Sequence, residues 1–539
     1  PYSFPPPAGE KVFVACGEEL EVALGFSEIR KGKRALPCGI LPSGDVAYLD
    51  LKYILGDNGA HINISGQSGV AAKTSYATFL LWMLMNYSRY VKDNAFSNQL
   101  VNSRSLVFNV KGESLLFLDY WNEEWKRAQK KDSEEGRQFA EWQEMFRLFE
   151  VEPHPFSELE VYVPPRNEKG SPHIRHSRPE VKAYGWDILD IVELGLLPLM
   201  FDPEELSQNP NFLLTVTVIE DFLRDQYDGL VADARRELRS GSYPVKIDLQ
   251  GLTDQEIVRV YLQAAGEEPR LILESFSLPN NLISLITMLR LSLEGEGKLG
   301  EELQREQIDP RTTLAISRRL RAARRTGLNL LWRDITRLPY REVKEVPEGG
   351  YHLRWNRPGG ISVVDISKLT YQGQAFVVGA VLREIMHWKE RERLAEPVFV
   401  YLDELNKYAP RTGGGPLGNI FRDVAERGRS FRVVLIGAEQ TASQVDYRVI
   451  TQAATTVVGR QKLAELHKEE YAHLEGNLRD KAATLLPGEV IIDQPFLRIP
   501  LTVKFPLPPW ATSEENREEL YRKEVVFTPE EELKKLLGE

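Results

Sequence analysis

The chain has 539 residues, of which 42% are hydrophobic and 27% are charged, so it has room for about two to four domains. Its formal net charge of -11 argues against a protein that coats nucleic acid with its outer surface, although a ring can confine positive charge to a central channel. No apolar run reaches the ~18–20 residues of a membrane span, so no membrane association is expected. Cys16 and Cys38 are not in a metal or redox spacing, which fits a reducing cytoplasm.

The first 57 residues are expected to form a small N-terminal β-barrel. Short β-type segments at Lys11–Ala15, Leu20–Leu24 and Val46–Leu51 are separated by Gly and Pro turns. The chain begins at Pro1 without a methionine, so we expect this barrel to be incomplete.

A glycine loop follows the β-type run His61–Ser65, in the sequence HINISGQSGVAAKTS. Strand, glycine loop, Lys-Thr and apolar helix is the arrangement that binds nucleotide phosphates. Lys73 is expected to reach the β- and γ-phosphates, and the Thr74 hydroxyl to bind Mg²⁺. The predicted nucleotide-binding residues are Gly66, Ser68, Gly69, Val70, Ala71, Ala72, Lys73, Thr74 and Ser75.

This loop departs from the usual pattern G-x-x-x-x-G-K-[ST]. Ala72 stands where a glycine directly precedes the lysine, and counted from Gly66 the lysine arrives one residue late. The loop alone therefore does not decide between a phosphate site and a chance match, and the rest of the chain has to do so.

After this loop the chain alternates between strand and helix patterns, with one long interruption. Ser105–Val110 has the pattern of a buried strand. Residues 122–341 are mostly helical, with a β-like edge at Leu159–Pro164, and resemble an insertion into an α/β domain. Its amphipathic stretches are Glu123–Phe149, Pro210–Leu223, Asp254–Ala265 and Leu282–Leu293.

The alternation then resumes, which predicts a parallel sheet. Strand patterns at Ile361–Ile366, Val398–Asp403, Val433–Glu439 and Thr455–Gln461 alternate with helical patterns that include Gln374–Arg393 and Leu417–Arg427, and Gly488–Phe505 again resembles strands. The expected domains are the barrel at 1–57, the first part of the core at 58–121, the helical insertion at 122–341, the second part of the core at 342–487, and C-terminal strands and tail at 488–539.

Two of the predicted strands end in residues suited to ATP chemistry. Val398–Leu402 delivers Asp403 and Glu404 to the carboxyl edge of the sheet, where ligands of parallel sheets bind. Asp403 would support Mg²⁺, and Glu404 would activate the water that attacks the γ-phosphate. At the end of the next strand, Gln440 could sense that phosphate, although alone it would be an ordinary strand terminus.

Three arginine and histidine patterns are less specific. Arg427 and Arg429 form either a solvated face or a cation that reaches the γ-phosphate of a neighbouring subunit. The basic run from Arg318 to Arg325 fits a solvated or intersubunit helix face better than DNA contact. His173 and His176 have an H-x-x-H spacing without further nearby metal ligands.

The order of the motifs resembles the HerA/FtsK group of ring-forming DNA-motor ATPases, and within it HerA. The resemblance spans about residues 10–505. It rests on the glycine loop, LVFNVKGE at Leu106–Glu113, VFVYLDELNKYAPR at Val398–Arg411, ERGRSFRVVLIGAEQTASQVD at Glu426–Asp446, and ITQAATTVVGR at Ile450–Arg460.

This resemblance implies a RecA-like P-loop ATPase core that uses ATP and Mg²⁺. It implies that Glu404 is the catalytic carboxylate, Gln440 the sensor, Arg429 a finger acting on the neighbouring subunit, and Arg460 a second cation. Thr74 and Asp403 would be the metal-binding residues. Besides the altered loop, Asn109 departs from the family pattern, because an acidic residue is common there.

The resemblance also implies partners. Members of this group form hexameric rings around double-stranded DNA and act with a nuclease, typically NurA, in DNA end resection. Other relatives work with nuclease or sirtuin-like effectors in antiphage defence. We therefore expect a cytoplasmic, hexameric DNA translocase, with an NTP-gated scaffold or motor subunit of an antiphage complex as the alternative.

Overall fold

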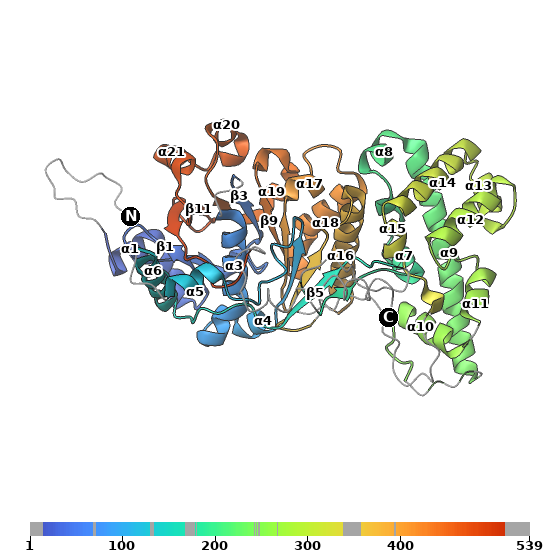
Figure 1. Ribbon diagram of the computed structural model, residues 1–539, viewed down its shortest axis with the longest axis horizontal. Helices are drawn as coiled ribbons and strands as arrows, with labels where there is room; N and C mark the ends of the chain where they lie inside the picture. Colours follow the sequence, from blue (N-terminus) through green and yellow to red (C-terminus); the bar gives the residue numbers. More distant parts are fainter. Residues whose placement is uncertain are drawn as a thin grey trace, which may run out of the picture.

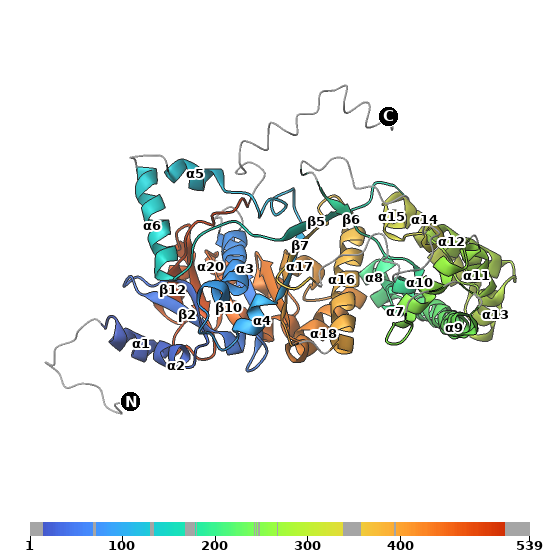
Figure 2. The same ribbon diagram turned by 90° about the horizontal axis from the view of Figure 1, so that it is seen from below.

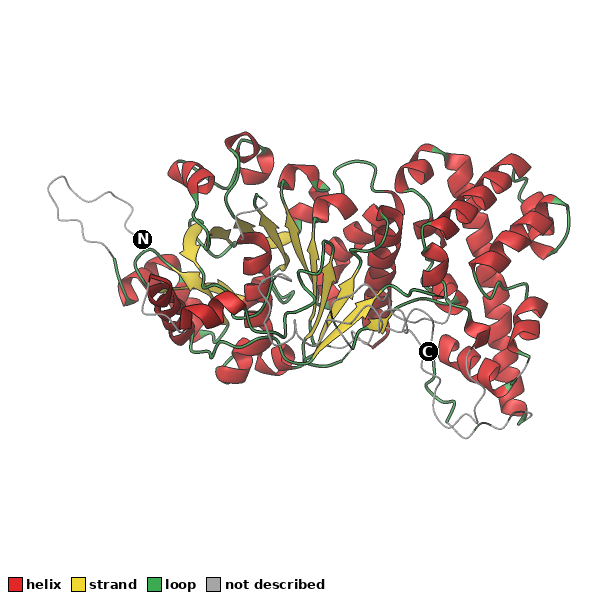
Figure 3. Cartoon of the chain, in the orientation of Figure 1, coloured by secondary structure: helices red, strands yellow, loops and turns green. Residues whose placement is uncertain are grey.

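The computed structural model describes residues 15–67, 72–129, 134–167, 178, 180–241, 243, 245, 248–266, 268–337, 357–392 and 395–512. Within these residues a 12-stranded sheet runs through the molecule, with helices packed against it (Figures 1 and 3). The strands are β1 (Ala35–Ile40), β2 (Val46–Asp50), β3 (Ala60–Ser65), β4 (Arg104–Asn109), β5 (Leu159–Val163), β6 (Lys182–Ala183), β7 (Ile361–Asp365), β8 (Val398–Asp403), β9 (Val433–Glu439), β10 (Ala453–Val458), β11 (Glu489–Asp493) and β12 (Leu501–Lys504).

The order of the strands is β2-β1-β12-β11-β10-β3-β9-β8-β4-β7-β5-β6. Every pair from β10 to β6 is parallel, and the pairs from β2 to β10 are antiparallel. The strand that leads into the glycine loop, β3, lies between β10 and β9 in the parallel part. The predicted α/β fold class with a parallel-rich sheet is confirmed.

The N-terminal region differs from the expected barrel over its described residues, 15–57. Strands β1 and β2 pair with each other and join the main sheet through β12, so these residues form no separate barrel. The strand predicted at Leu20–Leu24 is wrong, because these residues lie in helix α1 (Glu18–Leu24). Glutamates in its first turn suit the positive end of the helix dipole, and Gly25, at φ 81°, ends the helix in a left-handed conformation.

The predicted helical insertion is divided among three places. Strands β5 and β6 extend the central sheet beyond β7, whereas α5 (Glu123–Gln129) and α6 (Glu134–Leu148) lie at the opposite end of the molecule from the remaining helices (Figure 2). The remaining helices, from α7 to α15, form a helical body. They are α7 (Ile188–Glu193), α8 (Pro203–Gln208), α9 (Pro210–Ser240), α10 (Asp254–Ala264), α11 (Pro269–Ser275), α12 (Leu282–Leu293), α13 (Lys298–Arg305), α14 (Pro310–Arg325) and α15 (Leu328–Leu331).

Helices cover both faces of the parallel strands, and β8 shows how. Its alternate residues Val398, Val400 and Leu402 pack in one core with α16 and α18, while Phe399 and Tyr401 pack in a second core with α3. The bounds of the other helices are α2 (Phe26–Lys31), α3 (Ala72–Tyr90), α4 (Ser97–Val101), α16 (Tyr371–Glu392), α17 (Leu405–Tyr408), α18 (Gly415–Phe431), α19 (Tyr447–Thr451), α20 (Leu463–Leu466) and α21 (Asn477–Thr484).

The last described residues pack against the middle of α3. The Trp510 indole stacks on Trp82, with 5.8 Å between ring centroids, and donates a hydrogen bond to Thr78 Oγ1 at 3.1 Å.

Among the helices that the structure describes, none is long and apolar enough to cross a membrane. His173 and His176 lie outside the described residues.

Candidate nucleotide-binding site

Polar residues of neighbouring strands meet at the carboxyl edge of the sheet. Ser65 at the end of β3 is level with Glu439 at the end of β9, and Asp403 of β8 lies one position earlier, opposite Ala438. Asn109 of β4 is level with Asp365 of β7. Because all these strands are parallel, their side chains and the loops that follow them converge on one place.

Lys73 lies in the first turn of α3, directly opposite the carboxylate of Asp403. Its Nζ is 4.0 Å from Asp403 Oδ1, which is longer than a normal hydrogen bond, and its side chain is only 9% exposed. Burial lowers the pKa of the Lys73 ammonium, and Asp403 acts in the opposite direction. The structure therefore brings Lys73 and Asp403 together, and their roles toward a nucleotide stay predictions.

The glycine loop is described only at its two ends. The Gly66 N–H donates to the Glu439 carbonyl at 3.1 Å, and the Gln67 N–H donates to the Arg460 carbonyl at 2.9 Å. A Cβ at Gly66 would lie 3.3 Å from Lys73 Cγ, so the strand end and the start of the helix approach closely. The predicted contacts of Ser68, Gly69, Val70 and Ala71, and of the Ala72 side chain, lie outside the described residues.

Thr74 and Ser75 follow Lys73 in the same helical turn. Tyr401 of β8 is fully buried, which raises the pKa of its phenol well above the ordinary value, and the Thr74 side chain partly opposes this shift. Thr74 therefore lies against the strand that carries Asp403. The Ser75 side chain is buried.

Glu404 occupies an unusual backbone conformation directly after β8. Its φ and ψ are 57° and 41°, in the left-handed region, where a residue other than glycine costs about 1–3 kcal/mol. Its N–H donates to Asp403 Oδ1 at 2.8 Å, and its carboxylate forms an ion pair with Lys111 from the turn after β4. Strain of this kind is concentrated at functional sites, and here it occurs at the predicted catalytic carboxylate.

Glu439 is a buried acid that the sequence reasoning treated as a strand terminus. Its side chain is fully buried, and burial raises the pKa of the carboxyl well above its ordinary value, with Asn63 and Lys73 acting in the opposite direction. Asn63 lies beside it without the geometry of a hydrogen bond, and within the described residues neither carboxyl oxygen has a partner. The register of β3 and β9 places this acid level with Ser65, the last residue before the glycine loop.

Gln440 and Arg460 also lie at the carboxyl edge, and both side chains are exposed. The Gln440 carbonyl accepts a hydrogen bond from Gln461 Nε2 at 2.6 Å, which joins the ends of β9 and β10. Gln461 is buried and was missed by the sequence reasoning, since nothing in the local pattern marks it. The structure thus brings Arg460 to the glycine loop of its own chain.

Arg429 lies at the other edge of the sheet. Its guanidinium donates to the carbonyls of Gly56, at 3.1 Å, and Asp57, at 3.0 Å, in the loop that precedes β3. The seven residues of β9 separate it from the carboxyl edge by about 20 Å, at ~3.3 Å per residue. Arg429 is therefore not part of the site that its own Lys73 forms, and its role on a neighbouring subunit stays a prediction.

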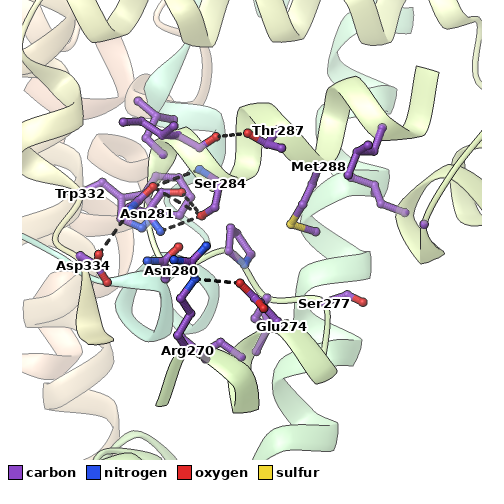
Figure 4. Close-up of a pocket in the computed structure, with 18 of the residues that line it drawn as sticks. Arg270, Glu274, Ser277, Asn280, Asn281, Ser284, Thr287, Met288, Trp332 and Asp334 are labelled. Atoms are coloured by element: carbon purple, nitrogen blue, oxygen red, sulfur yellow. Dashed lines mark hydrogen bonds and ion pairs between the residues drawn. The ribbon is translucent and has the colours of Figure 1, made fainter. Parts of the chain in front are cut away.

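A cavity of about 640 Å³ lies far from these residues in the helical body, between α11, α12 and α13 (Figure 4). The Arg270–Glu274 ion pair and the hydrogen bond from Asn281 to Asp334 form part of its wall. The basic run of α14 lies on the same body, where Arg319 pairs with Glu205 of α8. Part of that run thus serves contacts within the helical body.

Comparison with family profiles and with curated proteins finds no match for this chain. Among solved structures, VirB4 of Thermoanaerobacter pseudethanolicus is similar over 87% of this chain and 96% of its own, with 14% identity and a TM-score of 0.47. The bacterial conjugative coupling protein TrwB is similar over 92% of this chain and 94% of its own, with 11% identity and a TM-score of 0.43. Both TM-scores lie below 0.5, so these similarities do not identify a function for this chain.

Proposed function

We propose that this protein binds and hydrolyses ATP at the carboxyl edge of the sheet and uses the energy to move double-stranded DNA. The observation that carries the proposal is the convergence of Lys73, Asp403 and Glu404, which come from two separate strand ends. The ammonium of the buried Lys73 lies 4.0 Å from Asp403 Oδ1, too far for a hydrogen bond. It can therefore still donate to a phosphate oxygen bound beside it. A triphosphate is the ligand that uses all three side chains.

The side chains then have distinct tasks. Lys73 and the N–H groups at the start of α3 bind phosphate oxygens. Glu404 accepts a proton from water as the water oxygen attacks the γ-phosphorus, and ADP leaves with the electron pair of the broken P–O bond. Gln440, at the end of the neighbouring strand, would contact the transferred phosphoryl group or the water.

Mg²⁺ fits the donors that are present. The Thr74 hydroxyl and the Asp403 carboxylate would hold it, and both are the hard oxygen ligands that Mg²⁺ prefers. Mg²⁺ bound beside a nucleotide takes most of its ligands from phosphate and water, so two protein oxygens suffice. When bound, the ion would neutralise charge on the phosphates.

We propose assembly into a ring, hexameric by resemblance, because only a neighbouring copy could use Arg429 for hydrolysis. An arginine about 20 Å from its own site contributes to hydrolysis only if a second copy presents its site there. The DNA would pass through the channel of such a ring, where positive charge can be confined despite the net charge of -11. A NurA-like nuclease as partner, DNA end resection as process and the cytoplasm as location remain predictions from sequence.

The decisive experiment measures ATP hydrolysis with and without linear duplex DNA, together with the native mass of the assembly. A motor is expected to form a ring and to hydrolyse ATP faster when DNA is present. Hydrolysis that ignores DNA in an intact ring would contradict the motor and favour the alternative, an NTP-gated scaffold or subunit of an antiphage complex with a nuclease or sirtuin-like effector.

A further inference from the structure

The predicted catalytic carboxylate is already engaged by a cation from another part of the chain. Lys111 lies in the turn that follows β4, and its ammonium forms an ion pair with the Glu404 carboxylate. The Lys111 side chain is 58% exposed, while that of Glu404 is 19% exposed. An ammonium that pairs with a carboxylate occupies its lone pairs, so those oxygens are not free to accept a hydrogen bond from water.

The turn that carries Lys111 is fixed by a hydrogen-bonded asparagine. Asn109 Nδ2 donates to the Gly112 carbonyl at 2.8 Å and to Asp365 Oδ1 at 2.7 Å. Asn109 Oδ1 accepts from the Leu115 N–H at 3.2 Å. The position that departs from the family's acidic pattern therefore ties the Lys111 turn to the end of β7.

The short helix that follows Glu404 is hydrogen-bonded to the same strand end through Gln374. Gln374, near the start of α16, donates from Nε2 to the Ile366 carbonyl at 3.0 Å, directly after β7. Its Oε1 accepts from Lys407 Nζ at 2.7 Å and from the Tyr408 hydroxyl at 3.0 Å, both in the short helix that Glu404 begins. The two partners of the ion pair are thus held by separate connections to the residues that end β7.

We propose that Lys111 is a positioning residue that restrains Glu404 until the site is ready for hydrolysis. The inference rests on the proposed ATPase function, and it adds a control of that site which neither the motifs nor the glycine loop indicate. Both connections are firm, but the ion pair between them is partly exposed and weak. A charged ligand or a shift of the strand-end loops therefore separates it at low cost, and Glu404 then becomes available to water.

The first test compares Lys111→Met with Lys111→Arg and with Lys368→Met. Lys368 is the matched control, since it lies beside the same turn, 3.7 Å from Glu113, and forms no ion pair with Glu404. Lys111→Met is expected to raise kcat for hydrolysis without DNA by up to about fivefold, the factor that corresponds to ~1 kcal/mol for an exposed ion pair, with KM unchanged. Lys111→Arg and Lys368→Met are expected to keep the wild-type rate. A lower kcat in Lys111→Met with normal ATP binding would overturn the proposal.

The second test needs no turnover, so it separates failure of this inference from failure of the proposed function. Melting temperatures are measured for wild type, Lys111→Met, Glu404→Gln and the double variant, without nucleotide and with a non-hydrolysable ATP analogue. The proposal predicts non-additive shifts without nucleotide that become additive with the analogue. Shifts that are additive without nucleotide, or equally non-additive in both states, would overturn it even if the protein hydrolyses no ATP.

Discussion

The two edges of the parallel sheet are built from the same strands but differ in how far their polar groups are paired within the protein. At the carboxyl edge, Lys73 faces a carboxylate at 4.0 Å, Glu404 is in a left-handed conformation, and Glu439 is buried. At the amino edge, His61 Nε2 lies 3.0 Å from the Ala425 carbonyl, and its Nδ1 accepts from the Leu435 N–H at 3.0 Å. The first edge leaves capacity for a ligand, whereas the second joins β3, β9 and α18.

Arg429 combines a structural contact with exposure that would allow a functional one. At the amino edge it already donates to two carbonyls, as a structural residue would, yet its side chain is exposed. If it also serves a neighbouring site, the amino edge of one copy faces the carboxyl edge of the next. Changes at the two edges are expected to affect different properties of the protein.

Among the changes at the amino edge, the largest effect is expected for Arg429→Ala. If this arginine completes the neighbouring site, ATP hydrolysis by the assembled protein falls by about three orders of magnitude while the ring stays intact. The matched control is Arg427→Ala, which removes an exposed arginine of the same helix that pairs with Asp423 and Glu390. Native mass and steady-state hydrolysis check both variants.

A mixing experiment then tests whether the site is shared. Subunits that carry both Glu404→Gln and Arg429→Ala are added to wild-type subunits in increasing proportion. Shared sites predict that activity falls more steeply than the wild-type fraction. Activity in simple proportion to that fraction would show that Arg429 acts only within its own chain.

The next prediction concerns His61 at the amino edge and the dependence of the unfolding free energy on pH. Burial lowers the pKa of His61 to about 4, whereas an unfolded histidine titrates near 6.5. Between these values the unfolded chain binds more protons, so the contribution of His61 is complete above about pH 6.5 and is lost as the pH falls toward 4. About 3 kcal/mol of unfolding free energy is expected to disappear over this range.

Urea unfolding between pH 7 and pH 4.5 measures this loss. His61→Asn is expected to flatten the dependence, and asparagine tolerates the φ of 63° at this position. His467→Asn is the control, because His467 is exposed. Equal pH dependence in wild type and His61→Asn would contradict the assignment.

A smaller effect on stability is expected for Gly428→Ala. A Cβ there would lie 2.8 Å from the Val433 carbonyl oxygen and 3.2 Å from His61 Cε1, so overpacking is expected to cost about 1–3 kcal/mol. At Gly418 of the same helix the nearest atom is Arg422 Nη2 at 3.4 Å, and Gly418→Ala is expected to be neutral or slightly stabilising. Chemical denaturation of both variants checks the difference, and equal stabilities would show that the approach of His61 to this helix is loose.

Local patterns predicted the elements that carry the site. The run Val433–Glu439 forms β9 at the predicted bounds, because a continuous apolar run with branched residues leaves little choice. Strand β1 was missed because Pro37 and Gly39 resemble a turn, whereas the structure places them at an irregularity in the pairing with β2. The predicted strand at Leu20–Leu24 lies in helix α1, which has only seven residues. In so short a segment, the hydrophobic periodicity does not distinguish a helix from a strand.

Contacts between distant strands could not be predicted in this way. The strand ends at Asp403 and Gln440 were identified because each follows an apolar run, but the burial of Glu439 depends on its register with Ser65 of β3. The ion pair between Lys111 and Glu404 likewise joins two turns that are almost 300 residues apart and meet only because β4 and β8 are neighbours. The domain boundaries proposed from sequence remain predictions, although the helical stretch at 122–341 contributes two strands to the central sheet.

The measurement that tests the central claim most directly is nucleotide binding and hydrolysis by Glu404→Gln. Binding is expected to remain close to wild type, since Lys73 and Asp403 are unchanged, while hydrolysis falls by about two to four orders of magnitude through loss of the base. Asp403→Asn, one residue earlier, is the companion variant and is expected to weaken binding of the Mg²⁺ complex as well. Normal turnover by Glu404→Gln would contradict the assignment of the catalytic carboxylate, and with it the account of this edge of the sheet.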